Sequence, residues 1–231
     1  MKKEFQFKEG EVLLINKPIH WTSFQVVNKL RWGIKRQLGV KKIKVGHAGT
    51  LDPLATGLMI ICTGKKTKEI NQYQAAEKEY IATIKLGATT PSYDGETIEN
   101  YFYATEHINT DLIIKTIRAF IGDIQQNPPI FSAIKVKGKK LYESARKGKD
   151  IETKPRNIRI IKLEILGIEM PYVQFRVSCS KGTYIRSLAH DIGKALNSGA
   201  WLCKLKRTKI GEHSLKNAID IQDFEDMMKS L

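Results

Sequence analysis

The chain has little cysteine, no long apolar run and, over long stretches, almost no acid. Its three cysteines, Cys62, Cys179 and Cys203, are an odd number without CxxC spacing, which argues against a disulfide framework and a zinc site. No apolar run approaches the roughly 18 residues of a membrane-spanning helix. The N-terminus lacks the continuous apolar segment of a secretory signal. We therefore expect a protein of the reducing cytoplasm that is not embedded in a membrane.

Basic residues dominate what is present. The 231 residues include 39 Lys and Arg against 24 Asp and Glu, a formal net charge of +15. This excess favours a polyanionic partner, either nucleic acid or an anionic membrane surface. Hydrophobic residues make up 42%, which is enough to bury the core of one large domain, or of one domain with a small insertion.

The positive charge is concentrated in three segments. Residues 12–68 contain 11 basic residues and a single acid, Asp52; residues 135–162 contain 11 against three acids, and residues 181–209 contain seven against one. If the three segments fold onto one face, they form a long positive groove. Otherwise they are three separate solvated surfaces with no common ligand.

Hydrophobic periodicity predicts strands and helices in irregular order. We expect strands at 11–16 and 79–86, a strand pair at 157–169 and 172–180, a helix capped by Thr22 or Ser23 and ended by Gly39, a helix from Thr110 or Asp111 to Gly122, a helix at 187–196, and terminal helices within 214–228. Because strands and helices do not alternate regularly, the prediction is an α+β fold with a mixed, mainly antiparallel sheet and flanking helices.

The segment Gly46–Gly57, GHAGTLDPLATG, is the most informative. It matches neither the phosphate loop nor G-x-G-x-x-G, which disfavours a nucleoside triphosphate site. Asp52 is expected to stay ionised among its cationic neighbours, and such a carboxylate can act as a nucleophile or base. Asp-Pro is equally a helix-start signature, so both interpretations stay open. His47 is either a structural hydrogen-bonding residue or part of a site.

Two further segments combine aromatic and basic residues. In Cys179–Arg186, Tyr184 and Arg186 are two apart, so on an extended segment they would share one face and could stack a base and hold an anion. A buried tyrosine with a structural arginine is the alternative. Residues 126–148 interleave basic and aromatic side chains after Pro128-Pro129, a pattern typical of surfaces that follow an RNA strand.

Together these segments resemble the bacterial tRNA pseudouridine synthase B (TruB) family. The resemblance covers roughly residues 11–211, in the family's order. The matching blocks are the Gly46–Gly57 segment, K-x-Y at Lys78–Tyr80, Q-x-P-P-x-F-S-A-x-K from Gln126, G-T-Y-I-R at Gly182–Arg186 and L-K-R at Leu205–Arg207. It implies a sheet of the pseudouridine synthase type, a single catalytic domain over 1–231 with a peripheral insertion near 90–155, and a helical tail at 212–231.

The resemblance also implies an activity and residue roles. The activity is isomerisation of the T-loop uridine of tRNA, position 55 by convention, to pseudouridine after base flipping. Its catalytic residues are the nucleophile Asp52, the proton-transfer residue Tyr184 and Arg186, which orients Asp52. Its substrate-binding residues are His47, the stacking Tyr80, the pocket-lining Leu205 and Lys17. Because the reaction is redox-neutral, no cofactor or metal is expected.

The expected partner is the tRNA T-arm, bound by a monomer without membrane or guide RNA. The sequence leaves two alternatives open: a tRNA-folding chaperone acting on the elbow, with or without catalysis, and synthase activity on another RNA. It also departs from the family. His20 replaces the usual glycine of K-P-x-G, and about twenty residues follow Gly211, from which we expect no full C-terminal PUA domain.

Overall fold

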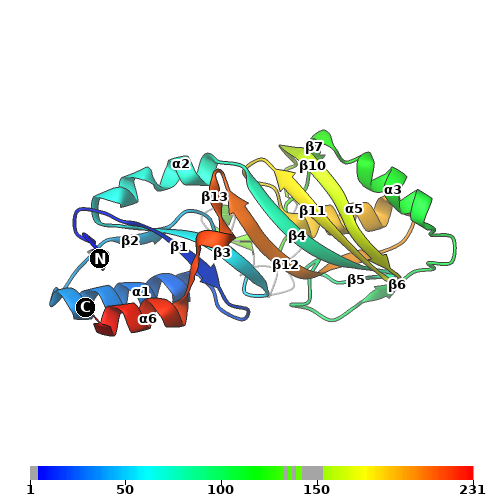
Figure 1. Cartoon of the computed structure of the whole chain (residues 1–231). Helices are drawn as coiled ribbons and strands as arrows, with labels where there is room; N and C mark the ends of the chain where they lie inside the picture. The colour runs from blue at the N-terminus through cyan, green and yellow to red at the C-terminus, as the bar shows by residue number, and fades with distance from the viewer. Residues whose placement is uncertain (1–4, 133–134, 137–138, 142–152, 231) are drawn as a thin grey trace. The chain divides into compact units, whose positions relative to one another are not determined.

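The computed structural model describes residues 5–132, 135–136, 139–141 and 153–230 (Figure 1). These form two compact units. Unit 1 comprises Met1–Tyr80 and Leu205–Leu231, and unit 2 comprises Ile81–Lys204. Two strands, β4 (Lys78–Leu86) and β12 (Ala200–Ile210), contribute residues to both units.

Unit 1 contains a mixed sheet in the order β14-β1-β3-β12. Besides parts of β4 and β12, unit 1 contains the strands β1 (Val12–Lys17), β2 (Val45–His47), β3 (Ala55–Thr63), β13 (His213–Ser214) and β14 (Ile219–Asp220). β3 is antiparallel to β1 and β2 and parallel to β12, in the register Leu205 to Ala55. β3 is buried along nearly its whole length, as is usual for a strand inside a sheet with both faces covered.

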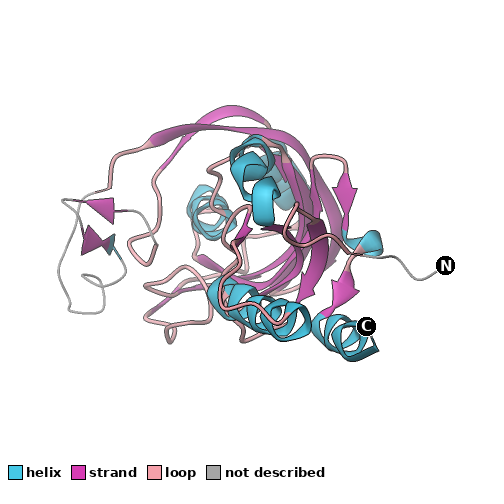
Figure 2. Cartoon of the chain, turned by 90° about the vertical axis from the view of Figure 1, so that its left-hand side faces the viewer, coloured by secondary structure: helices cyan, strands magenta, loops and turns pink. Residues whose placement is uncertain are grey.

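Two helices cover one face of this sheet. They are α1 (Ser23–Leu38) and α6 (Ile221–Ser230), and Figure 2 shows α6, at the C label, beside α1. Thr22 caps α1 in a capping box with Gln25, and Gly39 ends it with φ of 62°, as the sequence predicted. The shorter helices are η1 (Gly64–Glu69), α2 (Ile70–Ala75) and η2 (Leu215–Asn217).

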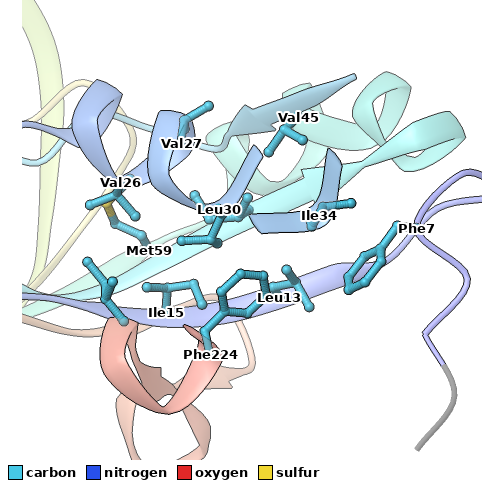
Figure 3. Close-up of a cluster of buried hydrophobic side chains, with 12 residues drawn as sticks. Phe7, Leu13, Ile15, Val26, Val27, Leu30, Ile34, Val45, Met59 and Phe224 are labelled. Atoms are coloured by element: carbon cyan, nitrogen blue, oxygen red, sulfur yellow. The ribbon is translucent and has the colours of Figure 1, made fainter. Parts of the chain in front are cut away.

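The core of unit 1 lies between these helices and the sheet (Figure 3). The apolar stripe of α1, with Val27, Leu30 and Ile34 among its members, packs on Leu13 and Ile15 of β1. Met59 from β3 and Phe224 from α6 complete the cluster. Burying a side chain such as Leu30 stabilises the fold by about 1.5–3 kcal/mol, so this cluster fixes the start of α1 against the sheet.

Unit 2 contains strands in the order β12-β4-β11-β10-β7. The remaining elements are β5 (Ala88–Thr89), β6 (Tyr101–Phe102), α3 (Thr110–Arg118), β7 (Gly122–Gln126), β8 (Lys135–Val136), β9 (Lys139–Lys140), β10 (Arg156–Glu169), β11 (Tyr172–Cys179) and α5 (Ile185–Ala195). β10 and β11 form the predicted antiparallel pair around Met170-Pro171. The predicted mixed, mainly antiparallel α+β fold is confirmed.

Two local predictions need correction, and one strand was missed. Asn109 caps α3, where the sequence suggested Thr110 or Asp111, and α3 ends at Arg118 because Gly122 already starts β7. The predicted terminal helices are a short 3-10 turn, a two-residue strand and α6. β12 was not predicted, because its alternation is obscured by four cations in the run Lys204–Lys209. Within the described residues, no helix has the length and apolar character needed to cross a membrane.

Candidate active site

Asp52 lies in the turn between β2 and β3. Its backbone carbonyl accepts a hydrogen bond from the Ala55 amide at 3.1 Å, with Pro53 at the second position of a turn, which suits its fixed φ. β3 starts at Ala55. The helix-start interpretation of Asp-Pro is therefore wrong, because a strand and not a helix follows.

The start of α1 holds the residue before Asp52. The Ser23 hydroxyl donates to the Leu51 carbonyl at 2.9 Å and accepts from the Leu51 amide at 2.8 Å. Both residues are buried. His20, next to the helix start, donates its amide to the Pro53 carbonyl at 2.8 Å. It adopts φ of 67°, a left-handed conformation that favours glycine, so this turn accommodates a side chain.

Lys17 is a fully buried cation beside Asp52. Its Nζ donates to the carbonyls of Pro18 at 2.9 Å, Trp21 at 2.7 Å and Pro53 at 3.3 Å. Burial lowers the pKa of Lys17 to about 8, the negative charge of Asp52 works against that shift, and the nearby Arg207 adds to it. The ammonium thus ties the end of β1 to the turn that carries Asp52.

Arg207 is a second buried cation bound to the same segment. Its Nε donates to the Leu58 carbonyl at 2.7 Å, and its two terminal nitrogens donate to Thr50 at 3.4 Å and Gly49 at 3.3 Å. The guanidinium therefore joins the backbone on both sides of Asp52. Gly57 has φ of 106°, and a Cβ there would lie 2.3 Å from the Arg207 carbonyl oxygen, so β3 can approach β12 this closely only with glycine.

The other expected residues of unit 1 lie on three strands, His47 on β2, Tyr80 on β4 and Leu205 on β12. His47 is partly buried at the end of β2, and its pKa is lowered mainly by burial and further by Arg207, while the Gly49 backbone opposes the shift. A lowered pKa favours the neutral ring. Leu205 pairs with Ala55 in the sheet. Tyr80 ends the part of β4 that belongs to unit 1 and is 9% exposed.

Arg186 forms a second polar centre, in unit 2. It lies in the first turn of α5, 4% exposed. Its Nε is 3.5 Å from Oδ2 of Asp94, and its terminal nitrogens donate to the carbonyls of Ser92 at 3.2 Å and Phe131 at 3.1 Å. Asp94 was not among the residues predicted from the sequence; the available signal was the pair of acids at Asp94 and Glu96.

Tyr184 is held by its backbone at the start of α5. Its amide donates to Gln126 Oε1 at 2.8 Å, and its carbonyl accepts from Gln126 Nε2 at 3.1 Å. Because α5 begins at Ile185, the expectation that Tyr184 and Arg186 share one face of an extended segment is wrong. Gln126 belongs to the predicted RNA-facing segment 126–148, of which 133–134, 137–138 and 142–148 lie outside the described residues.

His190 and Asp191 on α5 form a further group of titratable residues together with Tyr93, the neighbour of Asp94 in the sequence. The rings of Tyr93 and His190 stack with centroids 4.1 Å apart. Burial raises the pKa of the adjacent Asp191 to about 6 and lowers that of His190. The described residues contain no cluster of three or more His, Cys, Asp or Glu side chains suited to a metal ion.

The structure therefore divides the expected site residues between the units. Lys17, His47, Asp52, Tyr80 and Leu205 belong to unit 1, and Tyr184 and Arg186 belong to unit 2. The charges of Asp52 and Arg207 both act on Lys17, and that of Arg207 also acts on His47. The pairing of Arg186 with Asp52 stays a prediction.

Curated relatives match nearly the full length of the chain. It is 57% identical over 222 residues to a Phocaeicola vulgatus protein named tRNA pseudouridine synthase B, covering 96% of this chain and 94% of that protein. A Flavobacterium johnsoniae protein of the same name is 56% identical, with 97% and 98% covered.

Solved structures share the fold. A Cbf5-Nop10-Gar1 complex contains a chain with a TM-score of 0.70 and 32% identity, covering 95% of this chain. A chain in the structure of an H/ACA RNP bound to a substrate RNA containing 2'-deoxyuridine has a TM-score of 0.67 and 30% identity, and the match again covers 95% of this chain. The present chain spans about half of those chains, 54% and 53%.

Family models account for most of the chain. Residues 35–185 match the N-terminal domain of the TruB family pseudouridylate synthases, and residues 186–230 match a tRNA pseudouridylate synthase B C-terminal domain. The first match includes the Asp52 turn, Asp94 and Tyr184, and the second begins at Arg186. With these matches and relatives above 50% identity over nearly its full length, the chain belongs to the TruB family of pseudouridylate synthases.

Proposed function

We propose that this chain isomerises uridine to pseudouridine in tRNA, at the T-loop uridine of position 55. The observation that carries the proposal is the Asp52 turn. A single carboxylate, in a segment with 11 basic residues, is fixed by a buried lysine and a buried arginine bonded to the backbone on both sides of it. Relatives that share 57% and 56% of the sequence are named tRNA pseudouridine synthase B.

The reaction needs few groups, because it is redox-neutral. The N1–C1′ bond breaks, the uracil turns, a C5–C1′ bond forms, C5 loses a proton and N1 gains one. Asp52 is the proposed nucleophile, attacking either C1′ or the uracil ring, and Tyr184 carries the proton transfer. Arg186 is proposed to orient Asp52, and Tyr80 and Leu205 to hold the freed base. His47 meets the RNA where the nucleotide is extruded.

Lys17 has a different proposed role from the substrate contact expected from the sequence. Its three N–H donors are all used by backbone carbonyls, and its side chain is fully buried. We therefore propose that Lys17 positions the Asp52 turn. Phosphate contacts fall instead to exposed lysines and arginines, whose binding free energy offsets the few kcal/mol needed to flip the target base.

The test is Asp52→Asn, assayed by mapping pseudouridine in tRNA before and after incubation with enzyme. We expect loss of product with tRNA affinity largely kept, because the amide has nearly the same shape and no nucleophilic charge. Asp223→Asn, an exposed substitution on α6, is the matched control and should form normal product. Normal product from Asp52→Asn would refute the nucleophile assignment.

The same variant separates catalysis from chaperone activity. If Asp52→Asn assists tRNA refolding as well as the unmodified enzyme does, the elbow-folding function exists beside catalysis; failure removes it. A bare T-arm stem-loop tests the proposed substrate and independence from guide RNA. Product formation by the purified chain, acting as a monomer, is the expected result.

A further inference from the structure

The outer face of α1 exposes large aromatic side chains. The inner face is occupied by the unit 1 core through Val26, Leu30 and Ile34. On the outer face, Phe24 is 63% exposed and Trp32 is 58% exposed. Single exposed apolar side chains are common on protein surfaces, so these two rings indicate a contact surface only together with the charges beside them.

The same region is uniformly basic. Between Ser23 and Val45 there are seven basic residues and no acid: Lys29, Arg31, Lys35, Arg36, Lys41, Lys42 and Lys44. Two of them have structural partners, since Lys29 pairs with Glu225 at 2.7 Å and Arg31 donates to Asn28 and to the Val45 carbonyl.

The remaining charges are available to a ligand. The Arg36 guanidinium lies 5.5 Å from the Trp32 ring centroid, which combines a cation and an aromatic face in one place. Lys41, Lys42 and Lys44 are exposed in the loop that follows. In the part of the chain that the structure describes, no ion pair is found for Arg36 or for these three lysines.

Apart from Phe24, this surface lies away from the Asp52 turn within unit 1. Ser23, at the start of α1, is hydrogen-bonded to Leu51. At 1.5 Å per residue, Trp32 is about 14 Å and Arg36 about 20 Å further along the helix. A ligand that occupies both places must therefore span about 14–20 Å, a length that several nucleotides of an RNA strand can cover.

We propose that this surface, the α1 basic face (Phe24, Trp32, Arg36, Lys41, Lys42 and Lys44), binds the substrate RNA at a distance from the target uridine. Its cations contact phosphates, and Trp32 stacks on an unpaired base. The proposal rests on the proposed function, which supplies RNA as the substrate. An anionic membrane fits less well, because the apolar stripe of α1 is already buried in the core and leaves only two rings for insertion.

The experiment compares Trp32→Ala and Lys41→Ala/Lys42→Ala with unmodified enzyme, by measuring Kd for unmodified tRNA between about 50 and 200 mM salt. The matched controls are Phe102→Ala, a 75% exposed aromatic on β6, and Lys115→Ala/Arg118→Ala on α3, two exposed cations. Anionic phospholipid vesicles are tested as a second ligand, and kcat and KM are measured for each variant.

We expect Trp32→Ala to weaken tRNA binding at least about 5-fold, and the double lysine variant to lower the salt dependence by about 1.5 in the log–log slope. KM should rise while kcat is unchanged, and the controls should match the unmodified enzyme. Unchanged tRNA affinity in both α1 variants, equal losses in the controls, or a loss seen only with vesicles would overturn the proposal. Absence of pseudouridine with unmodified enzyme would instead reject the proposed function, while the binding comparison still decides the surface.

Discussion

The two units hold their buried cations in different ways. In unit 1, Lys17, Lys78 and Arg207 each donate to two or more backbone carbonyls. In unit 2, Arg186 donates to two carbonyls and lies beside the carboxylate of Asp94, both side chains being less than 10% exposed. The first arrangement fixes the path of the backbone. The second adds the Asp94 carboxylate to the carbonyl acceptors, so substituting Asp94 should destabilise the buried position of Arg186.

Asp94→Ala should lower the stability of the fold more than any other substitution proposed below. It leaves the Arg186 guanidinium buried without this partner, and breaking a buried ion pair costs about 3–5 kcal/mol. Urea unfolding measures the loss. Asp94→Asn keeps the shape and part of the hydrogen bonding, so it should lose less. Equal stability of Asp94→Ala and the unmodified protein would show that the Asp94 carboxylate does not stabilise the buried Arg186 side chain.

Arg207→Met should have the next largest effect and lower the free energy of unfolding by about 3 kcal/mol. Three carbonyls around the Asp52 turn lose their hydrogen-bond donor, at about 1 kcal/mol each. Arg207→Lys restores charge but not the three-way geometry. In the folded variants, the proposed positioning role predicts a lower kcat with little change in KM. A purely structural role would lower stability alone and leave kcat of the folded Arg207→Lys protein intact.

Asp191→Asn should change the stability least, and the change should depend on pH. The pKa of Asp191 is raised from 3.8 to about 6 by burial. The folded state therefore binds the proton more tightly, and stability falls as pH rises from about 4 to 6. The asparagine variant lacks this loss, so it should become more stable than the unmodified protein by about 1–2 kcal/mol above pH 6, with no gain below pH 4. A stability difference independent of pH would contradict this assignment.

Regular local patterns were predictable. The α1 helix with its caps at Thr22 and Gly39, the β10–β11 pair and β4 follow from periodicity and capping chemistry, which act over a few residues. β12 was missed because four cations obscure its alternation and because its burial depends on parallel pairing with β3, about 150 residues earlier in the chain. The same long-range pairing makes Arg207 part of the Asp52 turn, so no local pattern could assign that role.

Composition, spacing and short-range motifs were enough to predict the family, the mixed, mainly antiparallel fold, the basic character and Asp52 as a candidate. The folded arrangement was needed to show that Asp-Pro precedes a strand, that Lys17 donates to backbone carbonyls, and that Asp94 is a partner of Arg186. Burial and hydrogen-bond partners are set by segments that meet only after folding. For that reason a cation's role cannot be inferred from its charge alone.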